Sequence, residues 1–536
     1  MYMLDCRKWG AILIILAFFL VGCNDQLLDL QPQSELTSDT FWKTKDDAKI
    51  ALTGVYSSRS WMGQTAILGL ETVTDNGIRT RIEATVGLFS GQLTPSDGTV
   101  SGLWESSYEQ ISRSNNFLEN IKGVDMDEGE KREMIAEVRF LRAWAYYNLS
   151  QYWGSVPLVK KTLTMQEANS VNRVPKEKVV DFVLTQLTEA AKNLPETRSA
   201  AEHGRIIKSA ALAVKGRLLL AEERWSEAAS VYKKIMDSGI HSIDPDYKAL
   251  FDGTKEQSDE IILTSRYIKN QVSNTLQRDV RPNLYGGWHF YNPYQNLVDA
   301  YLCKDGKPIE TSSLCDSNHP YENRDPRLYH NFFLPGYTEF AGERYRAHPD
   351  SVSTGDDMGG ENPLNTGYSV KKYVDEDYEG NIYTGGTDIP IIRYAEVLLS
   401  YLEAKIKSGE SITQDLLDQT INKVRRRSSV DMPPVTETNR NKLRNIVKLE
   451  RRTEFPFEGI RYWDLLRWRE FHNVLNRTFY GMKLTNNPES YDNFRVNEEG
   501  HYEVYTMTFN ENKDYQWPIP QDEIDVNPNL EQFPEY

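Results

Sequence analysis

Apolar residues recur at intervals of three and four along much of this 536-residue chain. That spacing places them on one face of an α-helix, with polar residues on the other. The clearest stripes are Ala48, Ala51, Leu52 and Val55; Trp104, Tyr108, Ile111 and Leu118; Val138, Leu141, Ala145 and Leu149; Val180, Val183, Leu187 and Leu194; Ile207, Ala211, Val214, Leu218 and Ala221; and Ala395, Leu398, Leu402 and Ile406. Each apolar face must be buried against another, so the pattern predicts a mainly α protein of packed helices, with Trp104 in its core.

One pair of predicted helices, within residues 213–236, matches a known repeat. Gly216, Ala228 and Tyr232 stand at the relative positions of the small, small and aromatic residues of a tetratricopeptide repeat. Small residues there allow two antiparallel helices to approach closely, and the aromatic ring fills the space beside them. A helical-repeat scaffold is therefore favoured, with an unrelated helical bundle as the alternative.

The helical period fades between about residue 255 and residue 388. Gly, Pro, Asn and Asp cluster there, for example in YGGWHFYNPY (285–294) and STGDDMGGENPLNTG (353–367). An irregular section of this length inside a compact protein is usually functional. Near the C-terminus, HYEVYTMTF (501–509) alternates in the manner of a β-strand.

The N-terminus carries a short apolar run that ends at a cysteine. Residues 9–22 are uncharged and follow Arg7 and Lys8, whereas a helix that spans a bilayer needs about 20 apolar residues. This order is typical of a secretory signal peptide. Its end, LVGC (20–23), resembles the bacterial lipobox, so we predict cleavage before Cys23 and attachment of acyl chains that hold the protein on a membrane. An ordinary signal peptide or a short anchor helix is the alternative.

Charge and cysteine content narrow the function classes. A net charge of −16 argues against nucleic-acid binding, which needs a basic face. The basic stretch KVRRRS (423–428) is interpreted as a solvated helix end. Beyond the N-terminal region only Cys303 and Cys315 remain, and outside the cytoplasm they could form a disulfide. Their spacing alone does not decide whether they pair.

No local signature of an enzyme is present. The eight histidines are scattered, and the sequence has no zinc-binding His-Glu-x-x-His, no Gly-x-Ser-x-Gly elbow and no phosphate-binding glycine loop. The stretch ERRTEFPFEGIRYWD could supply paired carboxylates from Glu450, Glu454, Glu458 and Asp464. A structural role is favoured, since Glu450 and Glu454 are one helical turn apart and Arg461 is spaced for a local ion pair with Asp464. We expect no catalytic residues and no cofactor.

Several longer stretches resemble one family, from the lipobox to the last residues. They are LDLQPQSELTSDTFWKTKDDA after the apolar run, AEVRFLRAWAYYNLSQYWGSVPLV and DIPIIRYAEVLLSYLEAK in the helical parts, LERRTEFPFEGIRYWDLLRW (449–468), and the closing WPIPQDEIDVNPNLEQ (517–532). The last two are the most specific. On these residues the chain resembles the SusD/RagB family of outer-membrane lipoproteins of the Bacteroidetes.

This resemblance implies a fold and a role. Family members are mainly α, with tetratricopeptide-like helical hairpins as a scaffold and a large irregular region with few short strands as the ligand face. They capture nutrient, commonly an oligosaccharide or polysaccharide, and deliver it without catalysis to a SusC-like TonB-dependent outer-membrane transporter. The resemblance implies a protein that is lipid-anchored in the outer membrane and faces the cell exterior, with Asp25 as part of a loosely defined export signal.

The same resemblance suggests how the chain is divided. Residues 1–22 are expected to be the signal peptide, 23–45 a lipidated tether, 46–254 an N-terminal helical region and 255–536 a C-terminal region, which contains the irregular insert at 255–388. Capture of peptides by the same architecture, or a scaffold without a ligand of its own, are the alternative functions. The acid-rich VDEDYEG stretch is either a solvated loop or a metal site.

The strongest candidates for ligand contact are aromatic. A flat aromatic ring can cover the apolar face of a sugar ring, while polar groups bind the hydroxyls. Tyr285, Trp288 and Tyr291 lie in chain broken by glycine and proline, where a loop can present them. Trp288 is favoured because Gly286 and Gly287 leave its backbone free to project. The alternative is that these rings fill the core beneath a long loop.

A second candidate segment is TDNGIRTRIEA (74–84), which family members place near the ligand. It supplies Asp75, Asn76, Arg79 and Arg81, and arginine is suited to paired hydrogen bonds with sugar hydroxyls. Trp61 is a weaker candidate. A surface ion pair is the alternative role for the charged side chains.

Overall fold

The computed structural model describes residues 41–58, 62–80, 93–351, 356, 358, 365–488 and 494–536. Its helices are α3 (Lys45–Tyr56), α4 (Gln64–Glu71), α6 (Gly98–Asn120), α7 (Glu128–Tyr152), α8 (Met165–Ala168), α9 (Lys176–Asn193), α10 (Lys208–Ala221), α11 (Trp225–Asp237), α12 (Leu276–Val280), α13 (Gln295–Asp299), α14 (Pro326–Asn331), α15 (Tyr394–Lys407), α16 (Gln414–Gln419), α17 (Ile421–Arg425), α18 (Arg440–Glu454), α19 (Ile460–Trp468), α20 (Phe471–Leu475) and α21 (Gln521–Val526). The predicted signal peptide, Cys23 and most of the tether at 23–45 lie outside the described residues.

The strands are short and lie mostly in the C-terminal half. They are β1 (Gly77–Arg79), β2 (Val156–Pro157), β3 (Arg173–Val174), β4 (Ile261–Ser265), β5 (Tyr291–Pro293), β6 (Phe332–Phe333), β7 (Glu339–Phe340), β8 (Glu343–Arg344), β9 (Ser369–Val370), β10 (Ile389–Arg393), β11 (Arg477–Lys483) and β12 (His501–Met507). Within the described residues they pair into six two-stranded antiparallel sheets. The mainly α fold with few short strands is therefore confirmed, as is the strand predicted in HYEVYTMTF.

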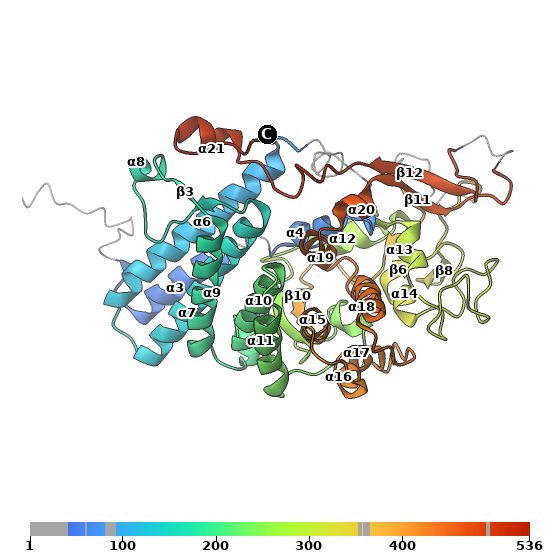
Figure 1. Cartoon of the computed structure of the whole chain (residues 1–536), viewed down its shortest axis with the longest axis horizontal. Helices are drawn as coiled ribbons and strands as arrows, with labels where there is room; N and C mark the ends of the chain where they lie inside the picture. Colours follow the sequence, from blue (N-terminus) through green and yellow to red (C-terminus); the bar gives the residue numbers. More distant parts are fainter. Residues whose placement is uncertain are drawn as a thin grey trace, which may run out of the picture.

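The N-terminal helices begin at residues that satisfy their free backbone N–H groups. Thr44 and Asp47 form a capping box at α3, whereas Asp97 caps α6 and Asp127 caps α7 through their carboxylates. In Figure 1, α3, α6, α7 and α9 form one group, and α10 and α11 follow beside it. Contacts run from α6 to α7, from α7 to α9, from α9 to α10 and from α11 to α15. The stripes read from the sequence are the buried faces of these helices, and Trp104 is in the core.

The predicted tetratricopeptide-like pair is α10 and α11. A Cβ atom at Gly216 would lie 2.5 Å from the Tyr232 ring, so the glycine is needed for the close approach of the two helices. Ala228 and Tyr232 are buried. The small, small and aromatic positions thus have the packing role that the sequence predicted.

The C-terminal segment returns to the N-terminal helices. Figure 1 shows α21 beside α8, far along the chain from it. The Trp153 indole donates a hydrogen bond to the Pro518 carbonyl at 2.7 Å, and the Trp517 ring packs 4.4 Å from that of Tyr152. Trp517 is buried. The closing WPIP stretch therefore has a structural role, because it packs against the C-terminal end of α7.

The acidic motif on α18 and α19 lies in a buried ion-pair network. Glu454 is fully buried and accepts hydrogen bonds from Arg327 at 2.9 Å and from Arg393 and Arg427 at 3.0 Å each. Burial alone would raise the pKa of Glu454, but the three guanidiniums outweigh it and lower that pKa to about 2. Glu450 joins the same network through Arg327 at 2.7 Å. The motif is thus structural, as the sequence favoured.

Two expectations about these charges are wrong. Arg461 does not pair with Asp464, because Asp464 accepts from Arg451 at 2.7 Å and from Arg467, while Arg461 reaches Asp75. The basic stretch 423–428 is not simply solvated, since Arg427 is buried against Glu260 and Glu454. Local spacing misled in both cases because the carboxylate partners come from distant segments.

Within the described part of the chain, no helix combines the length and apolar character needed to cross a bilayer. The division of the chain at residues 254 and 255 stays a prediction.

We expect Gly216→Ala to destabilise the protein by about 1–3 kcal/mol, because the new methyl group overlaps the buried Tyr232 ring. The matched control is Gly102→Ala in α6, where no atom lies within 4 Å of the added Cβ. Alanine there should be neutral or stabilising by about 0.5–1 kcal/mol. Denaturant unfolding followed by circular dichroism measures both, and equal behaviour of the two variants would contradict the packing role of Gly216.

Candidate ligand-binding face

The two candidate segments, more than 200 residues apart in sequence, are paired strands. β1 and β5 are antiparallel, with Gly77 opposite Pro293 and Arg79 opposite Tyr291. A Cβ atom at Gly77 would lie 2.5 Å from the Asn292 carbonyl oxygen, so only glycine allows this approach. The structure therefore brings residues 77–79 of the first predicted stretch beside residues 291–293 of the second.

The acidic start of the first segment lies under the surface. Asp75 is 3% exposed and accepts hydrogen bonds from Arg461 at 2.8 and 2.9 Å, with Arg452 at 3.1 Å. Burial opposes ionisation, but Arg452 and Arg461 outweigh it and lower the pKa of Asp75 to about 2. Asn76 is also buried, donating to Glu71 and accepting from Arg452 at 2.8 Å each. We assign Asp75 and Asn76 to the support beneath the face rather than to its surface.

Tyr291 is likewise buried and belongs to the support. The two glycines before Trp288 act differently from the prediction. Gly286 adopts the left-handed conformation with φ of 79°, and a Cβ atom at Gly287 would lie 2.0 Å from the Arg281 carbonyl oxygen. The Trp288 amide donates to the Arg278 carbonyl at 2.7 Å. The glycines therefore fix the backbone against 278–282, and the expectation that they leave it free is wrong.

Above this support lies a group of rings and guanidiniums that we call the aromatic platform, formed by Trp288, Phe290, Tyr383, Arg278 and Arg79. The Trp288 ring centroid is 5.3 Å from that of Phe290 and 6.0 Å from that of Tyr383, both edge to face. Arg278 places its guanidinium carbon 4.5 Å from the centre of Trp288, and Arg79 places its own 5.0 Å from that of Phe290. Trp288 is half-buried, and Tyr383 is 46% exposed.

Arg278 is oriented by a carboxylate. Its Nε donates to Asp279 at 2.6 Å and its Nη2 to the Thr275 hydroxyl at 3.2 Å. Asp279 is buried and also accepts from Gln64 at 2.7 Å. The Nε of Arg79 is buried and has no hydrogen-bond partner among the described residues. The platform thus offers apolar ring surface beside nitrogen donors, which suits a ligand with C–H faces and oxygen acceptors.

The other candidates lie apart from the platform or outside the described residues. Tyr285 is half-buried, with its ring 4.5 Å from that of Phe340 and its hydroxyl donating to the Glu343 carbonyl at 3.4 Å. It packs among other rings of the insert rather than against Trp288. Trp61 and Arg81 lie outside the described residues.

Cys303 and Cys315 form a disulfide with a Cα–Cα distance of 6.3 Å, which closes a short loop within the insert. In the VDEDYEG stretch, Glu376 pairs with Lys248 at 3.0 Å and with Lys371 at 3.3 Å. No group of three or more potential metal ligands occurs in the part of the chain that the structure describes.

Tyr383 and Arg278 were missed by sequence reasoning. Tyr383 stands in NIYTGG, glycine-broken chain with an aromatic residue, which is the signal that had selected Trp288. Arg278 lies on the short helix α12, and nothing in its local sequence marks it. A further exposed ring, Tyr337, stacks on Tyr329 at 5.2 Å in another part of the insert.

Two family models match the chain. Residues 249–536 match the model described as the SusD family, and residues 26–220 match the model described as starch-binding associating with outer membrane. Together they span most of the helical scaffold and the whole irregular insert.

Individual proteins are similar over nearly the whole chain. A SusD-like carbohydrate-binding protein from Bacteroides fragilis is 34% identical with a TM-score of 0.87, and the match covers 92% of this chain and 100% of that structure. A second SusD-like protein from the same species is 27% identical with a TM-score of 0.79, covering 94% and 100%. The starch-binding protein SusD of Bacteroides thetaiotaomicron is 24% identical over 407 residues, which are 67% of this chain and 68% of that protein.

A buried carboxyl in the support beneath the platform, Glu71, predicts that the stability of the protein depends on pH. Burial raises the pKa of Glu71 to about 7, although hydrogen bonds from Asn76 and from the Arg461 amide act to lower it. Between pH about 4.5 and 7 the Glu71 carboxyl stays protonated in the folded protein but loses its proton in the unfolded chain. The free energy of unfolding should therefore fall as pH rises from about 4.5 to 7. Relative to wild type, Glu71→Gln should gain on the order of 3 kcal/mol of unfolding free energy across that window.

Denaturant unfolding at pH 4.5, 6 and 8 measures this difference. The exposed Glu498→Gln is the control and should follow wild type at all three values. A constant difference between Glu71→Gln and wild type would contradict a raised pKa at Glu71.

Proposed function

This chain belongs to the SusD family, and we propose on that premise that it captures an oligosaccharide or polysaccharide at the outer membrane. The observation that supports this proposal most directly is the aromatic platform, where exposed ring surface stands beside arginine donors. The family description associated with residues 26–220 names starch binding and the outer membrane, and the B. fragilis relative is described as carbohydrate-binding. Each is a property of the family or of that relative, which we extend to this chain.

The platform residues have distinct roles in this proposal. Tyr383, which is 46% exposed, covers the C–H face of a sugar ring, and Trp288 supports it edge to face at 6.0 Å. Arg278, held by Asp279, and Arg79 donate hydrogen bonds to hydroxyl or ring oxygens. In this proposal the platform binds the ligand without catalysing a reaction, as the family resemblance implies.

Delivery belongs to the same proposal. The captured glycan passes to a SusC-like TonB-dependent transporter, and lipid on Cys23 keeps the protein at the outer membrane with its binding face to the cell exterior. The family resemblance supports these steps. Acyl chains provide durable attachment without a membrane-spanning helix.

We expect Tyr383→Ala and Trp288→Ala to weaken glycan binding by about tenfold or more, equivalent to at least about 1.4 kcal/mol. The measurement is retardation of the mature protein, with Cys23 removed, in native gels that contain a panel of neutral and acidic polysaccharides. Tyr337→Ala is the matched control, since it removes a similarly exposed ring away from the platform.

Retardation that survives both platform substitutions would contradict this site while leaving glycan capture intact. Retardation by no polysaccharide, together with protection of the platform tryptophan by peptide mixtures, would replace the glycan with a peptide.

A further inference from the structure

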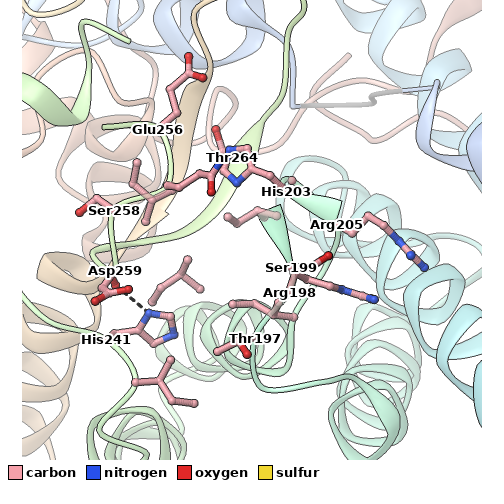
Figure 2. Close-up of a pocket in the computed structure, with 17 residues that line it drawn as sticks. Thr197, Arg198, Ser199, His203, Arg205, His241, Glu256, Ser258, Asp259 and Thr264 are labelled. Atoms are coloured by element: carbon pink, nitrogen blue, oxygen red, sulfur yellow. Dashed lines mark hydrogen bonds between the residues drawn. The ribbon is translucent and has the colours of Figure 1, made fainter. Parts of the chain in front are cut away.

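A cavity of about 170 Å³ lies in the scaffold, outside the platform (Figure 2). It is open to solvent on one side and is lined by residues from three stretches of chain: residues 197–207 between α9 and α10, residues 240–241 after α11, and residues 256–264, which end in β4. Its volume has room for about ten water molecules. That is close to the dozen heavy atoms of one sugar ring.

The arginines that line this cavity are already paired inside the protein. Arg198 contacts Glu133 and lies 3.1 Å from Glu137, and Arg205 also pairs with Glu137. His203 lies 3.0 Å from the Asp388 carboxylate. These pairings neutralise the positive charge, so the cavity is not built for an anion.

His241 supplies an acceptor that has no hydrogen-bond partner in the part of the chain that the structure describes. The side chain is 7% exposed, and its Nδ1 lies 2.9 Å from the Asp259 carbonyl oxygen, as Figure 2 shows. A carbonyl only accepts, so Nδ1 carries the hydrogen. Burial lowers the pKa of His241, which favours the neutral ring. Its Nε2 is then a lone-pair acceptor, and no group among the described residues donates to it.

An unsatisfied buried acceptor costs about 1–3 kcal/mol, so it marks a place where a donor belongs. The remaining wall of the cavity is mixed. Ile207, Ile240 and Ile261 contribute apolar surface, whereas the Thr197 hydroxyl and the Asp259 carboxylate are polar. The Asp259 side chain is exposed where it lines the cavity.

We propose that this cavity is a second binding site, which takes one neutral sugar ring with a hydroxyl donating to His241 Nε2. The apolar wall covers the C–H face of the ring, and Asp259 and Thr197 accept further hydroxyl donors. A neutral polyol satisfies the acceptors without adding charge beside paired arginines. This site is separate from the platform, so it does not depend on the proposed function.

The test follows the His241 imidazole by nuclear magnetic resonance. The sample is the full mature chain with Cys23 removed and with histidine labelled with ¹³C at Cε1. The sequence has eight histidines, and the His241→Phe spectrum assigns the signal. Glucose, galactose, mannose and xylose are added separately up to 50 mM, with ethanolamine as a charged comparison. We expect at least one sugar to move the His241 signal saturably while that of the exposed His319 stays in place.

Two variants define the site. Thr197→Trp, at an exposed position on the rim, should block the cavity and abolish the shift, whereas Tyr383→Ala at the platform should leave it unchanged. Calorimetry with the same sugar should show about three- to tenfold weaker binding by His241→Phe, the loss of one neutral hydrogen bond. Thermal unfolding of each variant within a few degrees of wild type shows that the fold is kept.

No movement of the His241 signal with any sugar would overturn the proposal, and the cavity would then hold only water. Movement with ethanolamine alone would also overturn it, because the occupant would be a cation. A shift that disappears in Tyr383→Ala would place the sugar at the platform instead.

Discussion

The fold depends on charges that are buried together. Glu454 on α18 accepts from Arg327 on α14, Arg393 at the start of α15 and Arg427 after α17, so one carboxylate joins three separate segments. A buried ion is tolerated only when its partners satisfy it, and removing one partner costs about 3–5 kcal/mol. The described strands of the irregular insert are only two to five residues long, and these ion pairs tie it to the helical scaffold.

The same helices also position the candidate binding face. Arg452 lies on α18 two residues before Glu454, and Arg461 lies on α19; both contact Asp75. Asp75 and Asn76 immediately precede β1, whose pairing with β5 places Trp288 and its neighbours. The face is therefore fixed by buried charge below and by a two-strand ladder at its side, before any ligand arrives. Such preorganisation lowers the ordering cost of binding.

Features that depend on local periodicity and on packing within one or two helices were predicted correctly from the sequence. The helical stripes and the contact between Gly216 and Tyr232 follow from spacing within one or two helices, and the structure confirms them. The pairing of Arg461 was predicted wrongly because its partner, Asp75, is nearly 400 residues away, and local spacing carries no information about such contacts. Of the candidate site, Trp288 and Arg79 reach the platform, whereas Tyr383 arrives from a turn that only the fold brings near.

This arrangement separates the residues that hold the fold from those that we propose to contact a ligand. Asp75, Asn76 and Tyr291 are buried, so changes there alter stability. Tyr383 projects from a turn whose backbone is held by Asn381 and Asn274, so its ring can change without disturbing the support. Because internal charge pairs and buried side chains fix the scaffold, the exposed ring residues can be substituted without loss of the fold.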